Sequence, residues 1–118
     1  MAKAVQHPGE LIESLVLVPS DCSQSRLARQ LGFNQPQPVN ELINGKRNIT
    51  PKMALLLEQI TRRHYPAEFW LLAQLRWDIA QSREQTSRSR LSMVQQLDGI
   101  EAADSGLLAL ATKLGALD

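Results

Sequence analysis

The sequence predicts an all-α protein, with five short helices in one domain and a helical extension after it. The chain has 118 residues, which suits a single domain, and 43% of them are hydrophobic. Its apolar residues recur three and four positions apart almost throughout, which is the spacing of one helix face. Apolar and polar residues do not alternate convincingly anywhere, so strands are not expected.

Capping residues, prolines and glycines divide this helical pattern. The first helix is expected to start at Pro8-Gly9 and to stop at Pro19-Ser20-Asp21. The second is expected to run from Ser23 to Gly32, and the third from Pro36 to Asn44-Gly45. Serine is a favourable N-cap residue, and glycine ends helices because it readily adopts positive φ. The short spacing between these signals predicts tight turns.

Two X-Pro pairs open the last two helices. Thr50-Pro51 places an N-cap residue before a proline, and Tyr65-Pro66 repeats this device for a helix over about 67–82. Residues 83–90 contain no apolar side chain, which predicts a linker or a solvated helical turn. We therefore expect a domain over 7–82 and an extension over 83–118, with one or two weakly amphipathic helices that pack on the domain or on a partner.

Residues 23–47, the reader unit, have the pattern of a helix-turn-helix. Two short helices flank a turn that contains Gly32, and Ala28 lies four residues before that glycine. Helices that cross closely accept only a small side chain at the crossing, and the reversal needs a residue able to adopt positive φ. The apolar residues of the second helix are expected to anchor it to the domain.

The outer face of the second helix is expected to be polar and rich in amides. Gln and Asn side chains can form paired hydrogen bonds with adenine in the major groove of DNA. The expected base-reading residues are Gln35, Gln37, Asn40 and Glu41. Basic and hydroxyl side chains around them would hold phosphates and set the position on the duplex. The expected phosphate contacts are Ser25, Arg26, Arg29, Lys46 and Arg47.

Aromatic residues of the fifth helix suggest how two copies associate. Phe69 is expected in the core, and its neighbour Trp70 lies about 100° round the helix. Trp77 follows on nearly the same face as Trp70. We therefore expect a dimer interface formed by Trp70, Leu71 and Trp77, with dimerisation through the extension as the alternative. Two such subunits would read an inverted repeat whose half-sites are about 34–36 Å apart.

The charge distribution limits the kind of nucleic-acid binding. The formal net charge of the whole chain is +1, but residues 1–83 carry +3 and residues 84–118 carry −2. This balance excludes a protein that coats nucleic acid generally, and it is compatible with a site-specific reader.

Other classes are not supported by the sequence. The one cysteine, Cys22, excludes an internal disulfide and fits a reducing cytoplasm. No apolar run approaches the roughly 18–20 residues that span a membrane, and the N-terminus lacks a secretory signal. The two histidines are not at metal-ligand spacing, and no acid–base pair or phosphate-binding glycine loop is evident. We therefore expect a cytoplasmic protein that is not an enzyme and has no metal or cofactor.

Four ordered segments resemble the HigA family of antitoxins, a branch of the Xre-type, lambda-repressor-like helix-turn-helix proteins. The matching segments are 7–10 (HPGE), 23–32 (SQSRLARQLG), 40–55 (NELINGKRNITPKMAL) and 67–71 (AEFWL), with Gln74 and Asp78. The resemblance implies a dimeric DNA-binding antitoxin of a type II toxin–antitoxin module. Such a protein neutralises a HigB-like, RelE-fold mRNA-cleaving toxin and represses its own operon. The residues implied for DNA contact are Gln37, Asn40 and Glu41 for bases, and Lys46 and Arg47 for the backbone.

Two features depart from the family. The link from Gly32 to Asn44 is one residue longer than usual, and Pro38 stands where relatives often carry arginine or another long polar residue. Proline is compatible with the first turn of a helix, so the fold is expected to survive, whereas one potential base contact is lost. Two other functions remain open: a stand-alone, phage-derived Xre-type regulator without a toxin, and a helical protein–protein adaptor.

Overall fold

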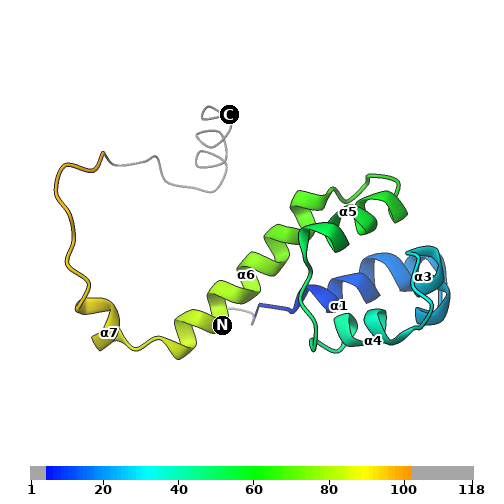
Figure 1. The fold of residues 1–118 in the computed structure, drawn as a ribbon, viewed down its shortest axis with the longest axis horizontal. Coiled ribbons are helices and arrows are strands. Elements are labelled where there is room, and N and C mark those ends of the chain that lie inside the picture. Colours follow the sequence, from blue (N-terminus) through cyan, green and yellow to red (C-terminus); the bar gives the residue numbers. More distant parts are fainter. Residues whose placement is uncertain (1–4, 102–118) are drawn as a thin grey trace. The chain divides into compact units, whose positions relative to one another are not determined.

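The computed structural model describes residues 5–101, and every regular element in that range is helical (Figure 1). The predicted all-α class is therefore confirmed. The chain falls into two compact units, one ending at Ser87 and one beginning at Arg88. No helix among the described residues is long and apolar enough to cross a membrane.

The first unit begins with three consecutive helical elements. These are α1 (Pro8–Ile12), the π-helical turn η1 (Glu13–Leu17) and α2 (Val18–Ser20). The stretch starts where predicted, because the Nδ1 atom of His7 accepts a hydrogen bond from the Gly9 N–H at 3.0 Å. It ends at Asp21, which adopts a left-handed conformation with φ of 51°. The sequence signals located both ends correctly but did not predict the π-helical turn.

The next two helices form the predicted helix-turn-helix. α3 (Gln24–Gln30) starts after Ser23, whose hydroxyl oxygen accepts a hydrogen bond from the Arg26 N–H at 3.1 Å. The turn contains Gly32 with φ of 95°, and α4 (Gln37–Ile43) follows. Pro38 lies in the first turn of α4, where a backbone N–H has no acceptor within the helix, so its missing N–H costs no intrahelical hydrogen bond. Proline is thus accommodated as expected.

The remaining helices are α5 (Pro51–Ile60), α6 (Ala67–Gln85) and the short α7 (Arg88–Ser92). Thr50 caps α5 as predicted, because its hydroxyl oxygen accepts from the Met53 N–H at 3.2 Å. α6 continues three residues past its expected end at residue 82. Arg, Glu and Gln at 83–85 have good helix propensity, so a stretch without apolar residues still extends the helix. The predicted division at 82/83 therefore falls inside α6, and the domain bounds themselves remain a prediction.

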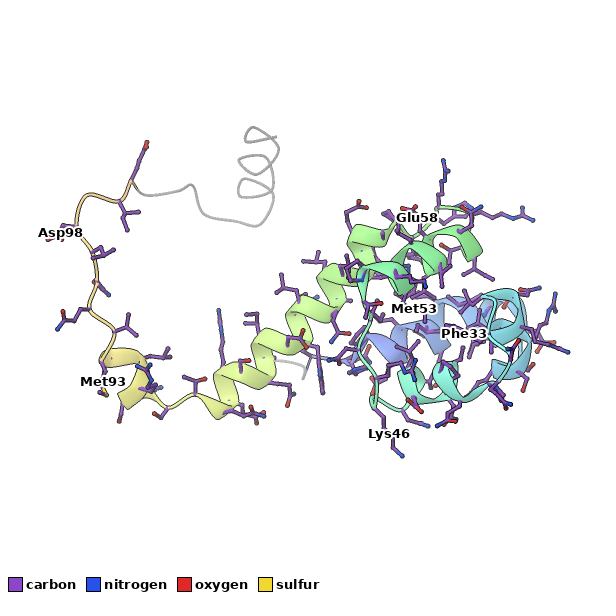
Figure 2. The ribbon with its side chains drawn as sticks, in the orientation of Figure 1. Phe33, Lys46, Met53, Glu58, Met93 and Asp98 are labelled. Atoms are coloured by element: carbon purple, nitrogen blue, oxygen red, sulfur yellow. The ribbon has the colours of Figure 1, made fainter. Side chains whose placement is uncertain are left out.

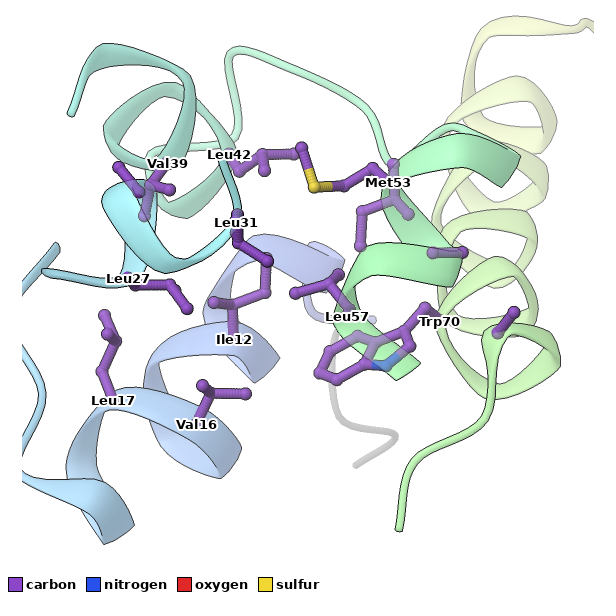
Figure 3. Packing of buried hydrophobic residues seen from close by; sticks show 14 residues of the cluster. Ile12, Val16, Leu17, Leu27, Leu31, Val39, Leu42, Met53, Leu57 and Trp70 are labelled. Carbon is purple, nitrogen blue, oxygen red and sulfur yellow. The ribbon is translucent and has the colours of Figure 1, made fainter. Parts of the chain in front are cut away.

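The core of the first unit collects buried residues from α1, η1, α3, α4, α5 and α6. Figure 3 shows Ile12, Leu31 and Leu57 in the middle of this cluster. Val39 and Leu42 anchor α4 to it as predicted, and Ile43 is half-buried against it. These contacts fix the orientation of the second helix of the reader unit.

Trp70 lies at the centre of the core, and Phe69 packs against that core from its edge. Trp70 is 0% exposed, and its indole N–H donates to the Tyr65 carbonyl at 3.2 Å, so its polar atom is satisfied inside the core. Phe69 is half-buried and packs against Tyr65 with ring centroids 5.0 Å apart. Because Trp70 shares its helix face with the buried Ala67 and Gln74, it cannot contribute surface to a dimer. Its assignment to the dimer interface was wrong.

The described part of the second unit exposes its apolar residues. On and after α7, the exposed large hydrophobic side chains are Leu91, Met93, Val94, Leu97 and Ile100. The sequence predicted one or two helices after residue 83, and α7 is the part of that prediction that falls on described residues. The apolar positions expected around 107–114 lie outside the described residues.

Candidate nucleic-acid interface

α4 is held against the start of the first helix by an unusually close backbone contact. A Cβ atom added to Gly9 would lie 1.6 Å from the Leu42 carbonyl oxygen, which is far inside contact distance. Any side chain at this position would therefore force α1 away from the C-terminal end of α4. The glycine of the HPGE segment is needed because of this approach and not because of its φ.

The loop after α4 is tied to α6 by the buried side chain of Gln74. Its Oε1 atom accepts a hydrogen bond from the Ile49 N–H at 2.7 Å. Its Nε2 atom donates to Asn48 Oδ1 at 3.1 Å and to Asp78 Oδ1 at 2.9 Å. Gln74 and Asp78 were recognised in the sequence only as part of a family motif. The structure shows that they fix the segment that follows Lys46 and Arg47.

The side chain of His7 packs beside Gly45, in the turn that ends α4. Its ring is buried and stacks edge-on against Trp77, with ring centroids 5.2 Å apart. The nearest atoms to a Cβ built on Gly45 belong to the same ring, at 3.7 Å. His7 therefore caps α1 and also fills the space beside the turn that ends α4.

The outer face of α4 carries a connected group of polar side chains. Gln37 Nε2 donates to Glu41 Oε1 at 2.8 Å. Arg47, from the following loop, donates from Nε to Glu41 Oε2 at 3.2 Å, and its Nη2 atom lies 3.2 Å from the same oxygen. Two expected base-reading residues and one expected phosphate contact are thus joined in one cluster.

A second group connects α4 to α3. Asn40 Nδ2 donates to Gln24 Oε1 at 3.0 Å, and Asn44 Nδ2 donates to Asn40 Oδ1 at 3.1 Å. Sequence reasoning expected Asn44 only to end the helix and assigned no role to Gln24. No local signal marks Gln24, because its partner Asn40 lies on another helix and is reached only after folding.

The other expected DNA contacts are placed less closely together. Gln35 is exposed in the turn before α4, and Lys46 projects from the loop after it (Figure 2). Ser25 and Arg29 are exposed on α3. Arg26 instead lines a hollow of about 650 Å³ that η1, α2, α3 and the 60–65 turn surround. All these DNA contacts remain predictions.

The described residues offer no group of three or more His, Cys, Asp and Glu side chains arranged to hold a metal ion. α4 presents a row of amide and charged side chains at the surface. The helix itself is held by the core, by α1 through Gly9 and by Gln74 through the loop that follows it. Amides and cations in this arrangement can form hydrogen bonds with base edges and phosphates. Fold and site together define a helix-turn-helix protein.

Comparison with known proteins narrows this class. No protein-family model matches the chain. Virulence-associated protein A of Dichelobacter nodosus is 34% identical over 68 residues, and virulence-associated protein A′ of the same organism is 38% identical over 79. These alignments cover 58% and 67% of this chain, and 65% and 66% of the relatives. The chain thus spans slightly less than two-thirds of the length of each.

Solved structures match more completely. The Pseudomonas aeruginosa antitoxin HigA, solved with the higBA promoter, is 26% identical, with a TM-score of 0.72 over 80% of this chain and 99% of that one. An antidote protein of a HigA family from Coxiella burnetii is also 26% identical, with a TM-score of 0.72 over 80% of this chain and 100% of its own. The resemblance to HigA proteins is confirmed. This chain has the helix-turn-helix fold of the HigA-type antitoxins that it resembles.

Proposed function

We propose that this chain is a dimeric antitoxin that binds an inverted-repeat operator, represses its own operon and neutralises a HigB-like, RelE-fold mRNA-cleaving toxin. The observation that carries the DNA half is the exposed face of α4, where Gln37 and Asn40 present amides and Arg47 follows at the helix end. The matching fold of the P. aeruginosa antitoxin solved with promoter DNA supports the same placement of α4 on a duplex.

The groups on α4 suit major-groove recognition. Amide side chains at Gln37 and Asn40 can bond adenine, while Arg47 and Lys46 lie beside them and can reach phosphates. Hydrogen bonds to Gln24, Asn44 and Glu41 hold the amides in defined positions before DNA arrives. Side chains positioned in advance lose less conformational freedom on binding.

The proposed dimerisation rests on the exposed apolar residues of α6. Leu75 is 51% exposed and Ile79 is 43% exposed, and with the half-buried Leu71 they recur every four residues along one helix face. This stripe replaces the fully buried Trp70 in the expected interface. Trp77 is half-buried against His7, which leaves part of it available beside the stripe. Pairing two such stripes would join two reader units in one molecule.

The proposed neutralisation of a toxin rests on the structural similarity to an antitoxin and an antidote protein. A stand-alone Xre-type regulator would have the same DNA chemistry. The two functions differ in whether the product of the neighbouring gene binds this chain and is inhibited by it. The adaptor alternative depended on Pro38 and the longer turn, and α4 forms normally with both present.

Binding of fluorescent duplexes from the region upstream of the gene tests the DNA half. Affinity is expected to fall steeply as salt rises, because bound phosphates release counterions. Absence of duplex binding at low salt would exclude the repressor and favour the adaptor. Co-expression with the neighbouring gene tests the toxin half: the antitoxin is expected to co-purify with that product and restore growth, whereas a stand-alone regulator does neither.

A further inference from the structure

We propose that Glu41 is a specificity-determining positioning residue, which restrains Arg47 and orients Gln37 instead of reading a base itself. This inference rests on the proposed DNA-binding function and concerns the same face of α4. It replaces the role expected for Glu41 from the sequence, which was to accept a hydrogen bond from a base.

Both carboxylate oxygens of Glu41 are already engaged. Oε1 accepts from Gln37 at 2.8 Å, and Oε2 accepts from Arg47 at 3.2 Å with a second guanidinium nitrogen at 3.2 Å. A carboxylate that reads cytosine must offer an oxygen to the exocyclic amine. Oε1 keeps one further acceptor site, but the contacts with Gln37 and Arg47 already fix the direction of the carboxylate, so a base would have to meet it in that orientation.

The pair is too exposed to be explained by stability alone. The side chains of Arg47 and Glu41 are 44% and 26% exposed. Ion pairs at such positions contribute little to folding because water and salt screen them. Their location on the face that meets DNA points to a role in binding.

A carboxylate on this face opposes general attraction to DNA. It repels phosphates directly, and it neutralises the guanidinium of Arg47, which would otherwise bind any phosphate backbone. Residues 1–83 carry a net charge of only +3, so one restrained arginine is a considerable share of the available attraction. Glu41 therefore lowers affinity for DNA of every sequence.

The same carboxylate favours one sequence through Gln37. With Oε1 accepting from Nε2, the Gln37 side chain is held in one orientation across one helical turn. An oriented amide loses less conformational entropy when it forms hydrogen bonds with the matching base, and it adapts less easily to a mismatched base. Weaker general binding and stronger orientation both increase the ratio of operator to non-operator affinity.

The test compares the full-length wild-type chain with Glu41→Gln on two duplexes, the upstream region of its own gene and a shuffled duplex of equal composition. Glu41→Gln is expected to bind the shuffled duplex several-fold more tightly and to discriminate less. The slope of log affinity against log salt is expected to steepen by about 0.9 for each arginine released onto a phosphate. Adding Arg47→Gln to Glu41→Gln is expected to abolish the steeper slope.

The controls distinguish failure of this inference from failure of the proposed DNA-binding function. Glu13→Gln removes one exposed carboxylate from η1 and is expected to leave the discrimination ratio unchanged, and thermal unfolding of each variant verifies folding. Failure of the wild type to bind either duplex would overturn the proposed function. If the wild type discriminates, an unchanged ratio and slope in Glu41→Gln would overturn the inference. A loss confined to the operator and restored by changing one C·G pair would make Glu41 a direct base reader.

Discussion

At the residue scale, Gln74 and Glu41 show two uses of a polar side chain in one small domain. Gln74 is buried and has hydrogen bonds to Ile49, Asn48 and Asp78, so it shapes the loop that carries Lys46 and Arg47. Glu41 lies at the surface and links Gln37 to Arg47. The first residue determines where the loop after α4 lies, and the second determines how the polar side chains on α4 are oriented.

Replacing Gln74 with alanine is expected to destabilise the fold by about 1–3 kcal/mol, because the buried Ile49 N–H loses its acceptor. Urea unfolding followed by circular dichroism measures this change. Gln85→Ala is the matched control, since Gln85 is an exposed glutamine of the same helix, and it is expected to change stability by less than about 0.5 kcal/mol. Equal effects of the two substitutions would contradict the role assigned to Gln74.

Replacing Gln37 with alanine is expected to weaken operator binding and to relax the preference at one base pair, with a cost of about 1–3 kcal/mol for a lost paired contact. Lys46→Ala is expected instead to weaken binding to all sequences and to reduce the salt slope by about 1, because Lys46 is exposed in the loop after α4. Fluorescence anisotropy with operator and shuffled duplexes distinguishes the two. Equal loss on both duplexes for Gln37→Ala would show that Gln37 does not read a base.

At the scale of helices, α4 depends on close approach as well as on apolar anchoring. The contact of Gly9 with the Leu42 carbonyl explains why the segment that opens α1 matters to a helix thirty residues later. Such a contact joins segments distant in the sequence and can be recognised only after folding.

Gly9→Ala is expected to destabilise the protein by at least about 1–3 kcal/mol and to reduce DNA binding, because a methyl group must displace the backbone of α4. Gly32→Ala adds the same methyl group where no heavy atom lies within 4 Å, but at φ of 95°. It measures the cost of positive φ alone, about 1 kcal/mol. Thermal unfolding and duplex titration compare the variants. A smaller effect at Gly9 than at Gly32 would contradict the proposed steric role.

The helix ends could be predicted because their causes are local. Ser23 and Thr50 cap the helices that follow them, and Gly32 adopts the expected positive φ. The facing of Phe69 and Trp70 could not be predicted, since two adjacent apolar residues each fit a core and only the position of α6 against its neighbours decides. The Glu41–Arg47 pair was missed for a similar reason, because a turn separates the two residues.

At the scale of the whole molecule, recognition of an inverted repeat requires two reader units in a fixed relation. The described residues provide an apolar stripe on α6, formed by Leu71, Leu75 and Ile79, and a second apolar set on and after α7. The two sets correspond to the two dimerisation modes expected from the sequence. Burial of Trp70 leaves α6 with smaller aliphatic residues than expected, which still repeat regularly along the helix.

Leu75→Ser combined with Ile79→Ser is expected to convert the proposed dimer into a folded monomer, because both side chains are largely exposed in the single chain and contribute less to its core than to an intermolecular contact. Light scattering after size-exclusion chromatography measures the mass, and Leu55→Ser removes an exposed leucine from α5 as the control. Operator affinity should fall far more than affinity for a half-site, since each monomer can bind one half-site only. A variant that remains dimeric would instead place the interface in the extension, where Leu91→Ser combined with Leu97→Ser should then produce the monomer.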